Sequence, residues 1–232
     1  MISEIGGIDP PLRPSQRALL WDLDGVLVDS SSFHYEAFRL VLAQRGLYLE
    51  EAFFRAQLLG LRNDVILTKI LGPISPEEIR ALADQKEELF RNLIAGRVRP
   101  LPGAAQLVRL AQAMGMSQAV VSSTPRQNIQ LLLGEMGMRD AFSVLIGEED
   151  VARGKPDPEG FLKAADSLGI PPHMCTVIED APEGVQAAKR AGMRCLAVAT
   201  TRPPHRLRRA DLVVPTLEDR RARAFLFIEK LR

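Results

Sequence analysis

Neither positive nor negative charge predominates in this chain of 232 residues, and cysteine is scarce. Its 30 Lys and Arg residues nearly balance its 29 Asp and Glu residues, which leaves a formal net charge of +1. This balance supplies no broad basic surface of the kind that nucleic-acid-binding proteins carry. The two basic clusters, residues 206–209 and 220–223, are interpreted as solvated helix faces. The two cysteines, Cys175 and Cys195, show neither C-x-x-C spacing nor metal-ligand spacing to a histidine, and we interpret them as reduced, buried thiols.

Long apolar runs are also missing. No stretch reaches the ~18 apolar residues that a membrane-spanning helix needs, and the N-terminus lacks the basic and then apolar segments of a secretory leader. We therefore expect a cytoplasmic protein that binds neither membranes nor nucleic acid and that exists as a monomer or a weak homodimer. Residues 1–16, which contain Pro10, Pro11 and Pro14, are expected to form a flexible lead-in.

The sequence does contain an early apolar segment that ends in two carboxylates. Residues 18–21, Ala-Leu-Leu-Trp, run directly into Asp22, Asp24 and Gly25. An apolar run bounded by a turn signal is typical of a strand buried on both faces, so Asp22 should lie where that strand leaves the core. Two carboxylates at such a position need a partner that stabilises their charge.

Residues 30–98 contain helix signals and no convincing strand signal. One helix, which begins near the serines after the first motif, is predicted to end at Gly46. A stronger helix begins at Ser75, where Glu78 completes a capping box, and runs to about Ile94. We interpret this region as a helical insert.

From Pro102 onward the pattern alternates regularly between helix and strand. The predicted strands are 118–122, 143–146, 176–179, 195–198 and 212–214, and the predicted helices are 103–114, 125–136, 158–168 and 182–191, with one further helix at the end. Such alternation favours βαβ units and therefore a parallel sheet with helices on both faces. The predicted fold is a Rossmann-like α/β core, residues 17–29 and 99–232, with a small all-helical cap, residues 30–98, inserted after the first strand.

Polar side chains follow the ends of several of these strands. They are Asp22, Asp24, Ser122, Lys155, Glu179 and Asp180. The carboxyl ends of parallel strands meet at one edge of the sheet, which is where ligands bind in open α/β folds. Clustered carboxylates raise one another's pKa unless a cation neutralises them, and an all-oxygen set of this kind suits Mg²⁺.

This combination of side chains suits phosphoryl transfer. Mg²⁺ and Lys155 would offset the charge of a phosphate, Ser122 would donate a hydrogen bond to it, and Asp22 would attack phosphorus to give an aspartyl phosphate. Asp24 would then be the general acid and base. Taken singly, each feature has a structural explanation, since Asp-x-Asp-Gly can form a turn, Ser122 can cap a helix and Lys155 can be a surface lysine. Their coincidence at strand ends favours the catalytic interpretation.

Four stretches, in order along the chain, resemble the four motifs of the haloacid dehalogenase superfamily. They are DLDGVLVDS from Asp22, VVSST around Ser122, GKPDP from Gly154, and VIEDAPEGVQAAKRAGM around Glu179 and Asp180. The helical insert resembles the cap of the β-phosphoglucomutase and phosphatase branch of that superfamily. The resemblance covers residues 17 to about 215.

The resemblance implies a role for each motif residue. Asp22 would be the nucleophile and Asp24 the acid and base. Mg²⁺ would be held by the Asp22 side chain, the Asp24 backbone carbonyl and Asp180, with Glu179 nearby. The residues that would bind the transferring phosphate are Ser122, Ser123 and Lys155. The cap would close over the site, exclude water and select the leaving group.

Two activities fit this resemblance, and they differ in what attacks the aspartyl phosphate. A phosphatase admits water, whereas a β-phosphoglucomutase uses a hydroxyl of a bisphosphorylated sugar. His34 matches a hinge histidine of the mutases, although it also has a structural interpretation as a partly buried helix residue, and Lys86 resembles a cap lysine that meets the substrate. Mutases also carry a cap arginine for the second phosphate; this chain has Asn63 there and Arg62 one place earlier. One helical position turns a side chain by about 100°, which disfavours the mutase.

We therefore predict a Mg²⁺-dependent phosphatase that hydrolyses a small phosphorylated metabolite, of the sugar phosphate or phosphoglycolate type, through an aspartyl phosphate. The cap residues expected to recognise the leaving group are His34, Arg62, Asn63 and Lys86. A β-phosphoglucomutase-like mutase is the alternative. A catalytically idle domain that only binds a ligand or a partner is less favoured, because the motif residues Asp22, Asp24, Lys155 and Asp180 are all present.

Overall fold

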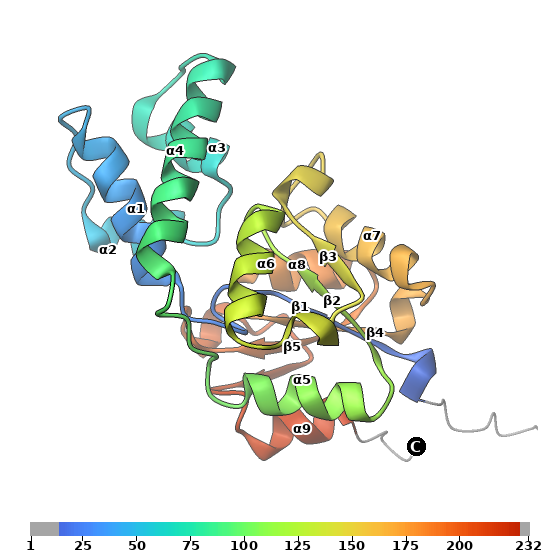
Figure 1. Cartoon of the computed structure of the whole chain (residues 1–232). Coiled ribbons are helices and arrows are strands. Elements are labelled where there is room, and N and C mark those ends of the chain that lie inside the picture. The colour runs from blue at the N-terminus through green and yellow to red at the C-terminus, as the bar shows by residue number, and fades with distance from the viewer. Residues whose placement is uncertain (1–13, 228–232) are drawn as a thin grey trace, which may run out of the picture.

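The structure is a computed structural model that describes residues 14–227 of the chain (Figure 1). Most of the predicted lead-in lies outside the described residues, so its expected flexibility stays a prediction. The described end of that segment, η1 (Pro14–Gln16), is a short 3-10 helix that leads directly into the first strand.

A six-stranded parallel sheet forms the centre of the molecule. Its strands are β1 (Ala18–Trp21), β2 (Ser117–Val121), β3 (Val144–Ile146), β4 (Cys175–Glu179), β5 (Arg194–Val198) and β6 (Leu212–Val214). Their order is β3-β2-β1-β4-β5-β6, so β1 lies between β2 and β4. Every residue of β1 and of β4 is buried, as expected for strands of a parallel sheet that is covered on both faces.

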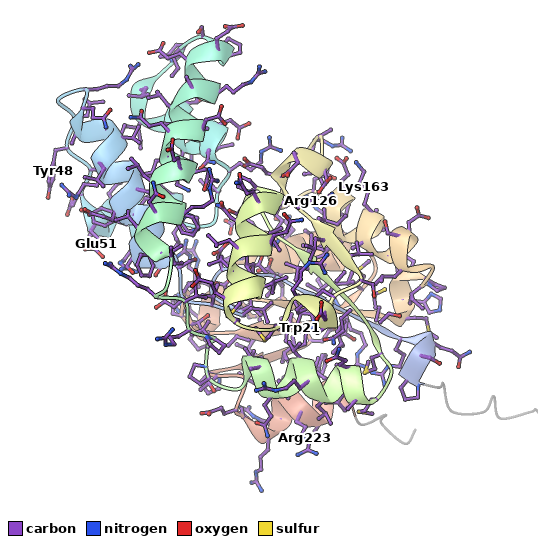
Figure 2. All side chains as sticks on the ribbon, in the orientation of Figure 1. Trp21, Tyr48, Glu51, Arg126, Lys163 and Arg223 are labelled. Atoms are coloured by element: carbon purple, nitrogen blue, oxygen red, sulfur yellow. The ribbon has the colours of Figure 1, made fainter. Side chains whose placement is uncertain are left out.

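Helices cover both faces of this sheet, as predicted (Figure 1). On one face they are α5 (Ala104–Ala113), α6 (Arg126–Glu135) and α9 (Arg220–Phe227), and on the other α7 (Glu159–Leu168) and α8 (Pro182–Arg190). Successive side chains of a strand point to opposite faces, so Leu19 and Trp21 join the first apolar core and Leu20 the second. Trp21 lies inside the molecule, where its indole N–H donates to Gln118 Oε1 at 3.0 Å (Figure 2).

The helices between β1 and α5 form a separate small layer, the cap, next to the carboxyl ends of the central strands (Figure 1). They are α1 (Ser31–Ala43), α2 (Glu51–Phe53), the π-helical turn η2 (Phe54–Leu58), α3 (Asn63–Leu71) and α4 (Pro76–Ile94). A third apolar cluster, which includes Phe38, Phe54 and Leu67, holds these helices together. Tyr48, which is 86% exposed, extends from the outer surface of the cap (Figure 2).

The predicted elements agree closely with the observed ones. Each predicted strand and helix from residue 103 to residue 214 matches the structure to within one residue at either end. Ser75 caps α4 as expected, since its Oγ accepts a hydrogen bond from the backbone N–H of Glu78 at 3.1 Å. Residues 30–98, all of them described, contain no strand. The bounds given for core and cap stay a prediction, and α2, η2 and α3 were not anticipated.

Short 3-10 helices connect several of the core elements. They are η3 (Arg139–Ala141), η4 (Glu148–Asp150), η5 (Pro172–Met174) and η6 (Pro204–Arg206). Cys175 and Cys195 are buried and unpaired, which confirms their interpretation as free thiols. Within residues 14–227, no helix has the length and apolar character needed to cross a membrane.

Candidate active site

Three adjacent strands deliver polar side chains to one edge of the sheet. Asp22 follows β1, Ser122 follows β2 and Asp180 follows β4. Sheet-like hydrogen bonding continues through the first two of these residues, because Asp22 N donates to Ile178 O at 2.9 Å and Ser122 N donates to Ile146 O at 3.0 Å. Their backbones are therefore fixed by the sheet at the edge where ligands bind in open α/β folds.

One pocket brings together all the core residues that the motifs single out. Its lining includes Asp22, Asp24, Ser122, Ser123, Lys155, Glu179 and Asp180. Leu59 and Gly60 of the cap also line it, so the pocket lies between core and cap. We refer to it as the reaction pocket. The structure thus places these residues together, while the chemical role of each stays a prediction.

Gly25 allows the loop after β1 to pass close to Asp180. Its φ of +85° lies in the left-handed region, and a Cβ at this position would lie 2.2 Å from Asp180 Oδ2. Gly25 N donates to Val28 O at 2.7 Å and closes the turn. The hydroxyl of Thr201 donates to the same Asp180 carboxylate. Asp180 is therefore held between a tight turn and a hydroxyl group at the end of β4.

Lys155 is the cation of the reaction pocket. Its ammonium group donates to Asp22 Oδ1, to Glu179 Oε1 at 2.6 Å and to the carbonyl oxygen of Val121 at 3.1 Å. Burial opposes the charge of this group, but the carboxylates of Asp22 and Glu179 outweigh burial and raise the pKa of Lys155 above its ordinary value. A permanent positive charge therefore lies directly beside Asp22.

Glu179 is enclosed by protein atoms. It is 1% exposed, and besides Lys155 it binds the backbone N–H groups of Asp180 and Ala181 at 2.9 and 3.0 Å. A Cβ at position 184 would lie 1.8 Å from Glu179 Oε1, so Gly184 leaves the room that this carboxylate occupies. These contacts make Glu179 the group that fixes the position of Lys155.

The two aspartates of the first motif have different electrostatic surroundings. Burial, reinforced by the neighbouring carboxylates, raises the pKa of Asp22 well above its ordinary value even though Lys155 lies beside it. Burial also disfavours charge on Asp24, but hydrogen bonds from His34 and Ser30 outweigh it and lower the pKa of Asp24. One carboxylate is thus desolvated, and the other is held ionised.

The donor atoms of the reaction pocket fit Mg²⁺. Among residues 14–227, no three His, Cys, Asp or Glu side chains converge on a common point as a metal site would require. Mg²⁺, however, needs only one or two protein carboxylates and keeps several water ligands. Burial and the charge of Glu179 raise the pKa of Asp180 to about 7, and a divalent cation would relieve that unfavourable charge. The oxygen donors available are the side chains of Asp22 and Asp180 and the backbone carbonyl of Asp24.

His34 and Lys86 connect the cap to Asp24. The His34 ring stacks on Phe90 with centroids 4.0 Å apart, and its Nε2 lies 3.5 Å from Asp24 Oδ1. Lys86 Nζ lies 2.8 Å from His34 Nδ1, and an ammonium group can only donate, so Nδ1 accepts and Nε2 carries the proton that faces Asp24. Lys86 is 1% exposed and pairs with Glu87 at 2.7 Å. A buried lysine of the cap therefore favours one tautomer of the histidine beside Asp24.

Arg62 and Asn63 are adjacent in sequence but face different pockets. Asn63 is buried, and its Nδ2 donates to Glu87 Oε1 at 2.8 Å. It lines a pocket, here called the cap pocket, whose wall also includes Asp24, His34, Lys86 and Ser123. Arg62 lines a second pocket with Ser122, Glu148 and Lys155, and its guanidinium lies 3.4 Å from the carbonyl oxygen of Val151. The two side chains would therefore meet different parts of a substrate.

Two further residues at the cap–core boundary were missed from the sequence. Glu87 receives a hydrogen bond from Asn128 Nδ2 of α6 at 2.5 Å, so it links the cap to the core. A signal for Glu87 was present, because Lys86 and Glu87 interrupt the apolar stripe that Leu82 and Phe90 form on α4, and a charged pair on a buried helix face needs partners.

Arg202, on the loop after β5, was also missed. Its two terminal nitrogens donate to the carbonyl oxygens of Arg55 at 2.9 Å and Leu59 at 3.0 Å, which hold the π-helical turn of the cap. Sequence patterns carry no signal for such a contact, because it joins segments more than a hundred residues apart and uses backbone oxygens.

The carboxylates and the lysine lie at the carboxyl end of the central strand, beneath a helical cap, which is the edge where enzymes with open α/β sheets bind their ligands. The chain belongs to the haloacid dehalogenase-like hydrolase family, whose family model matches residues 16–192. This confirms the resemblance seen in the four motifs.

Relatives of known name include both phosphatases and a mutase. The chain is 30% identical to validoxylamine A 7'-phosphate phosphatase of Streptomyces hygroscopicus subsp. limoneus, over 88% of this chain and 95% of the relative. It is 29% identical to β-phosphoglucomutase of Bacillus subtilis, over 88% and 91%. It is also 31% identical, over 91% of its length, to the chloroplastic 5-amino-6-(5-phospho-D-ribitylamino)uracil phosphatase of Arabidopsis thaliana, but spans only 58% of that longer protein.

Solved structures confirm the fold. A crystal structure of CbbY from Rhodobacter sphaeroides in complex with xylulose-(1,5)bisphosphate superposes with a TM-score of 0.81 and 26% identity, over 88% of this chain and 95% of CbbY. The chain is therefore an enzyme of this hydrolase family, and several of its relatives are named phosphatases.

Proposed function

We propose that the protein is a Mg²⁺-dependent phosphatase that releases phosphate from a small phosphorylated metabolite through an aspartyl phosphate on Asp22. The observation that best supports this function is the pairing of Asp22 with Lys155 at the end of the central strand, with Asp24 directed toward His34. A nucleophile, a cation for the phosphate and a proton carrier then share one pocket.

In the first half of the reaction, a carboxylate oxygen of Asp22 forms a bond to phosphorus while the bond between phosphorus and the ester oxygen breaks. Asp24 gives a proton to the leaving oxygen. Asp24 is ionised in the free protein, but the negative charge of an arriving phosphate raises its pKa, so Asp24 takes up a proton from water as the substrate binds. Lys155 and Ser122 bind the phosphate oxygens during this transfer.

In the second half, a water molecule attacks phosphorus and Asp24 takes its proton. The bond between phosphorus and Asp22 then breaks, and inorganic phosphate leaves. Mg²⁺, bound by Asp22, Asp180 and the Asp24 carbonyl, would offset the charge of the phosphate and so lower its repulsion of the attacking carboxylate. Glu179 keeps Lys155 in position throughout.

The cap residues recognise the leaving group in this proposal. His34, Asn63 and Lys86 line the cap pocket, and Arg62 lines the second pocket beside Ser122. A β-phosphoglucomutase-like activity is the second candidate, and the contact between Lys86 and His34 and the mutase among the relatives favour it. The phosphatase is preferred, because Asn63 stands where mutases carry an arginine and its amide is bound to a carboxylate.

The experiment is to measure phosphate release by the purified protein with Mg²⁺ across a panel of phosphate monoesters. The panel includes β-glucose 1-phosphate, with glucose 6-phosphate formation assayed in parallel and Asp22→Asn as the inactive control. Release from one or a few compounds that is lost in the variant supports the phosphatase. Glucose 6-phosphate formed with little free phosphate, after priming with a bisphosphate, would establish the mutase instead.

A further inference from the structure

The cap pocket contains a buried, charged carboxylate that the proposed reaction does not use. Glu87 of α4 is 5% exposed and accepts three hydrogen bonds. Asn63 Nδ2 and Lys86 Nζ donate to Oε1 at 2.8 and 2.7 Å, and Asn128 Nδ2 donates to Oε2 at 2.5 Å. Burial alone would raise the pKa of Glu87, but the charge of Lys86 and the hydrogen bonds from Lys86 and Asn63 outweigh it and lower the pKa, so the group is ionised.

This carboxylate lies in a pocket that the leaving group of a bound ester can enter. The cap pocket and the reaction pocket share Asp24 and Ser123, so a substrate with its phosphate at Asp22 can extend into the cap pocket. One part of the wall is apolar, with Phe38, Phe54 and Ile66, and the other part carries the polar groups around Glu87. The pocket thus offers an apolar surface beside a charged one.

The hydrogen-bond donors around Glu87 already donate to its carboxylate. Asn63 and Asn128 direct their amide N–H groups to the carboxylate. Lys86 Nζ lies 2.7 Å from Glu87 Oε1, so the two charges offset each other. A second phosphate or a carboxylate entering this pocket would therefore meet a fixed negative charge, and its binding would require these hydrogen bonds to break.

The position of Glu87 is fixed from both sides of the cap–core boundary. Asn128 of α6 also donates to Thr124 Oγ1 at 3.0 Å, and its Oδ1 accepts from the guanidinium of Arg91 at 3.0 Å. The carboxylate therefore cannot swing away from an anionic ligand without loosening the contact between α4 and α6.

We propose that Glu87 is a specificity residue, through which the cap pocket selects phosphate monoesters whose leaving group carries hydroxyl or amine groups and rejects those that carry a second phosphate or a carboxylate. This inference rests on the proposed phosphatase function. It places the substrate among monophosphates of polyols, sugars or amino sugars, and it excludes bisphosphates such as the ligand of the CbbY structure.

The test compares matched pairs of ligands that differ only in a second phosphate. They are fructose 1-phosphate with fructose 1,6-bisphosphate, and glucose 1-phosphate with glucose 1,6-bisphosphate. Binding to Asp22→Asn protein in the presence of Mg²⁺ is measured by calorimetry, and kcat and KM for phosphate release are measured with the parent enzyme. We expect the monophosphate of at least one pair to bind at least about tenfold more tightly than its bisphosphate, with the difference in kcat/KM carried mainly by KM.

Two variants test whether Glu87 causes the preference for monophosphates over bisphosphates. Glu87→Gln keeps the size of the side chain and removes its charge, and it should reduce the preference for the monophosphate at least about threefold. Glu88→Gln, which removes an exposed charge from the next position of α4, should leave the preference unchanged. Thermal melting verifies that both variants fold, and Glu88→Gln should also keep the parent's activity on the best monophosphate.

The outcomes separate this inference from the proposed function. Equal or tighter binding of the bisphosphates, failure of every monophosphate to bind, or an unchanged preference in folded Glu87→Gln would overturn the role of Glu87. Absence of phosphate release from every ester, together with selective binding of monophosphates by the Asp22→Asn protein, would instead refute the phosphatase and leave the selectivity of the cap pocket supported.

Discussion

Asp22 and Asp24 are separated by one residue, yet their neighbours prepare them for different chemistry. Both carboxylates line the reaction pocket. Asp22 is desolvated and lies against Lys155, whereas Asp24 accepts a hydrogen bond from Ser30 and lies 3.5 Å from the protonated Nε2 of His34. A nucleophile gains reactivity when it loses its hydration. A group that gives and takes a proton needs a hydrogen-bonding partner, here His34, beside it.

Replacement of the nucleophile gives the most direct prediction at this scale. Asp22→Asn should lower kcat at least about a thousandfold with Mg²⁺ present, because an amide does not form the phosphoryl intermediate. The fold should persist, since Lys155 keeps its contacts with Glu179 and the Val121 carbonyl. Phosphate release and circular dichroism measure the two effects. Asp166→Asn, an exposed position on α7, is the control and should keep full activity. Substantial turnover by the first variant would remove Asp22 as nucleophile.

At the scale of single elements, α4 carries both Lys86 and Glu87 into the cap pocket, and its first turn depends on Ser75. Ser75 Oγ accepts from the N–H of Glu78 at 3.1 Å, so Ser75→Ala leaves that donor without its cap. The free energy of unfolding should fall by about 1 kcal/mol, as measured by urea denaturation. Ser167→Ala, at an exposed position on α7, should cost much less. Equal stability of Ser75→Ala and the parent protein would contradict the capping role.

The π-helical turn of the cap is held to the core by Arg202. Arg202→Ala removes donors to the carbonyl oxygens of Arg55 and Leu59, and Leu59 lines the reaction pocket. We expect KM for the best substrate to rise several-fold, with a smaller change in kcat, because the closed cap becomes less populated. Chymotrypsin should also cleave near Phe54 faster. Arg208→Ala, an exposed change a few residues later, is the matched control. Unchanged KM and cleavage rate in Arg202→Ala would show that Arg202 does not hold the π-helical turn to the core.

The elements that the sequence predicted well are those whose signals are local. The apolar run of β1 and the capping box at Ser75 depend only on neighbouring residues, and the structure reproduces both. The elements η2 and α3 were not predicted, because η2 is a single π-helical turn of five residues and Gly60 breaks the segment between the two elements. The segment from η2 to α3 carries Arg62 and Asn63, so a part of the chain that the sequence predicted poorly is also a part that we propose recognises the substrate.

At the scale of the whole molecule, the topology explains why the core of the site was predictable and the cap pocket was not. Asp22, Ser122 and Asp180 follow strands of one parallel sheet, so knowledge of the strands alone places them at the same edge. Glu87 meets Asn128 only because α4 packs beside α6, and no rule of sheet topology fixes how an inserted helical layer sits on a core (Figure 1). The chemistry therefore follows from the sequence, while the specificity depends on the packing of two layers.

The acidic residues at the sheet edge make the stability of the whole molecule depend jointly on pH and Mg²⁺. The pKa of Asp180 is raised to about 7 in the folded protein without metal, and that of Asp22 is raised as well, whereas both groups titrate near 3.8 in an unfolded chain. Because the folded state holds these protons more tightly, the metal-free protein should lose stability as pH rises from about 4 through about 7. Mg²⁺ binds the ionised form, so at pH 6 it must displace a proton, while at pH 8 it need not.

Mg²⁺ should therefore stabilise the protein more at pH 8 than at pH 6. One pH unit below a pKa of about 7 weakens metal binding roughly tenfold, which corresponds to about 3 °C or more in Tm for a protein of this size. Differential scanning calorimetry with Mg²⁺ or with a chelator at the two pH values measures the difference. Asp180→Asn, which keeps the shape of the side chain and removes its titratable proton, should show a smaller Mg²⁺ effect that varies less with pH, because Asp22 still titrates. An equal rise in Tm at both pH values in the parent protein would show that no proton on a buried carboxyl group competes with the metal. It would contradict the assignment of Asp180 as a Mg²⁺ ligand.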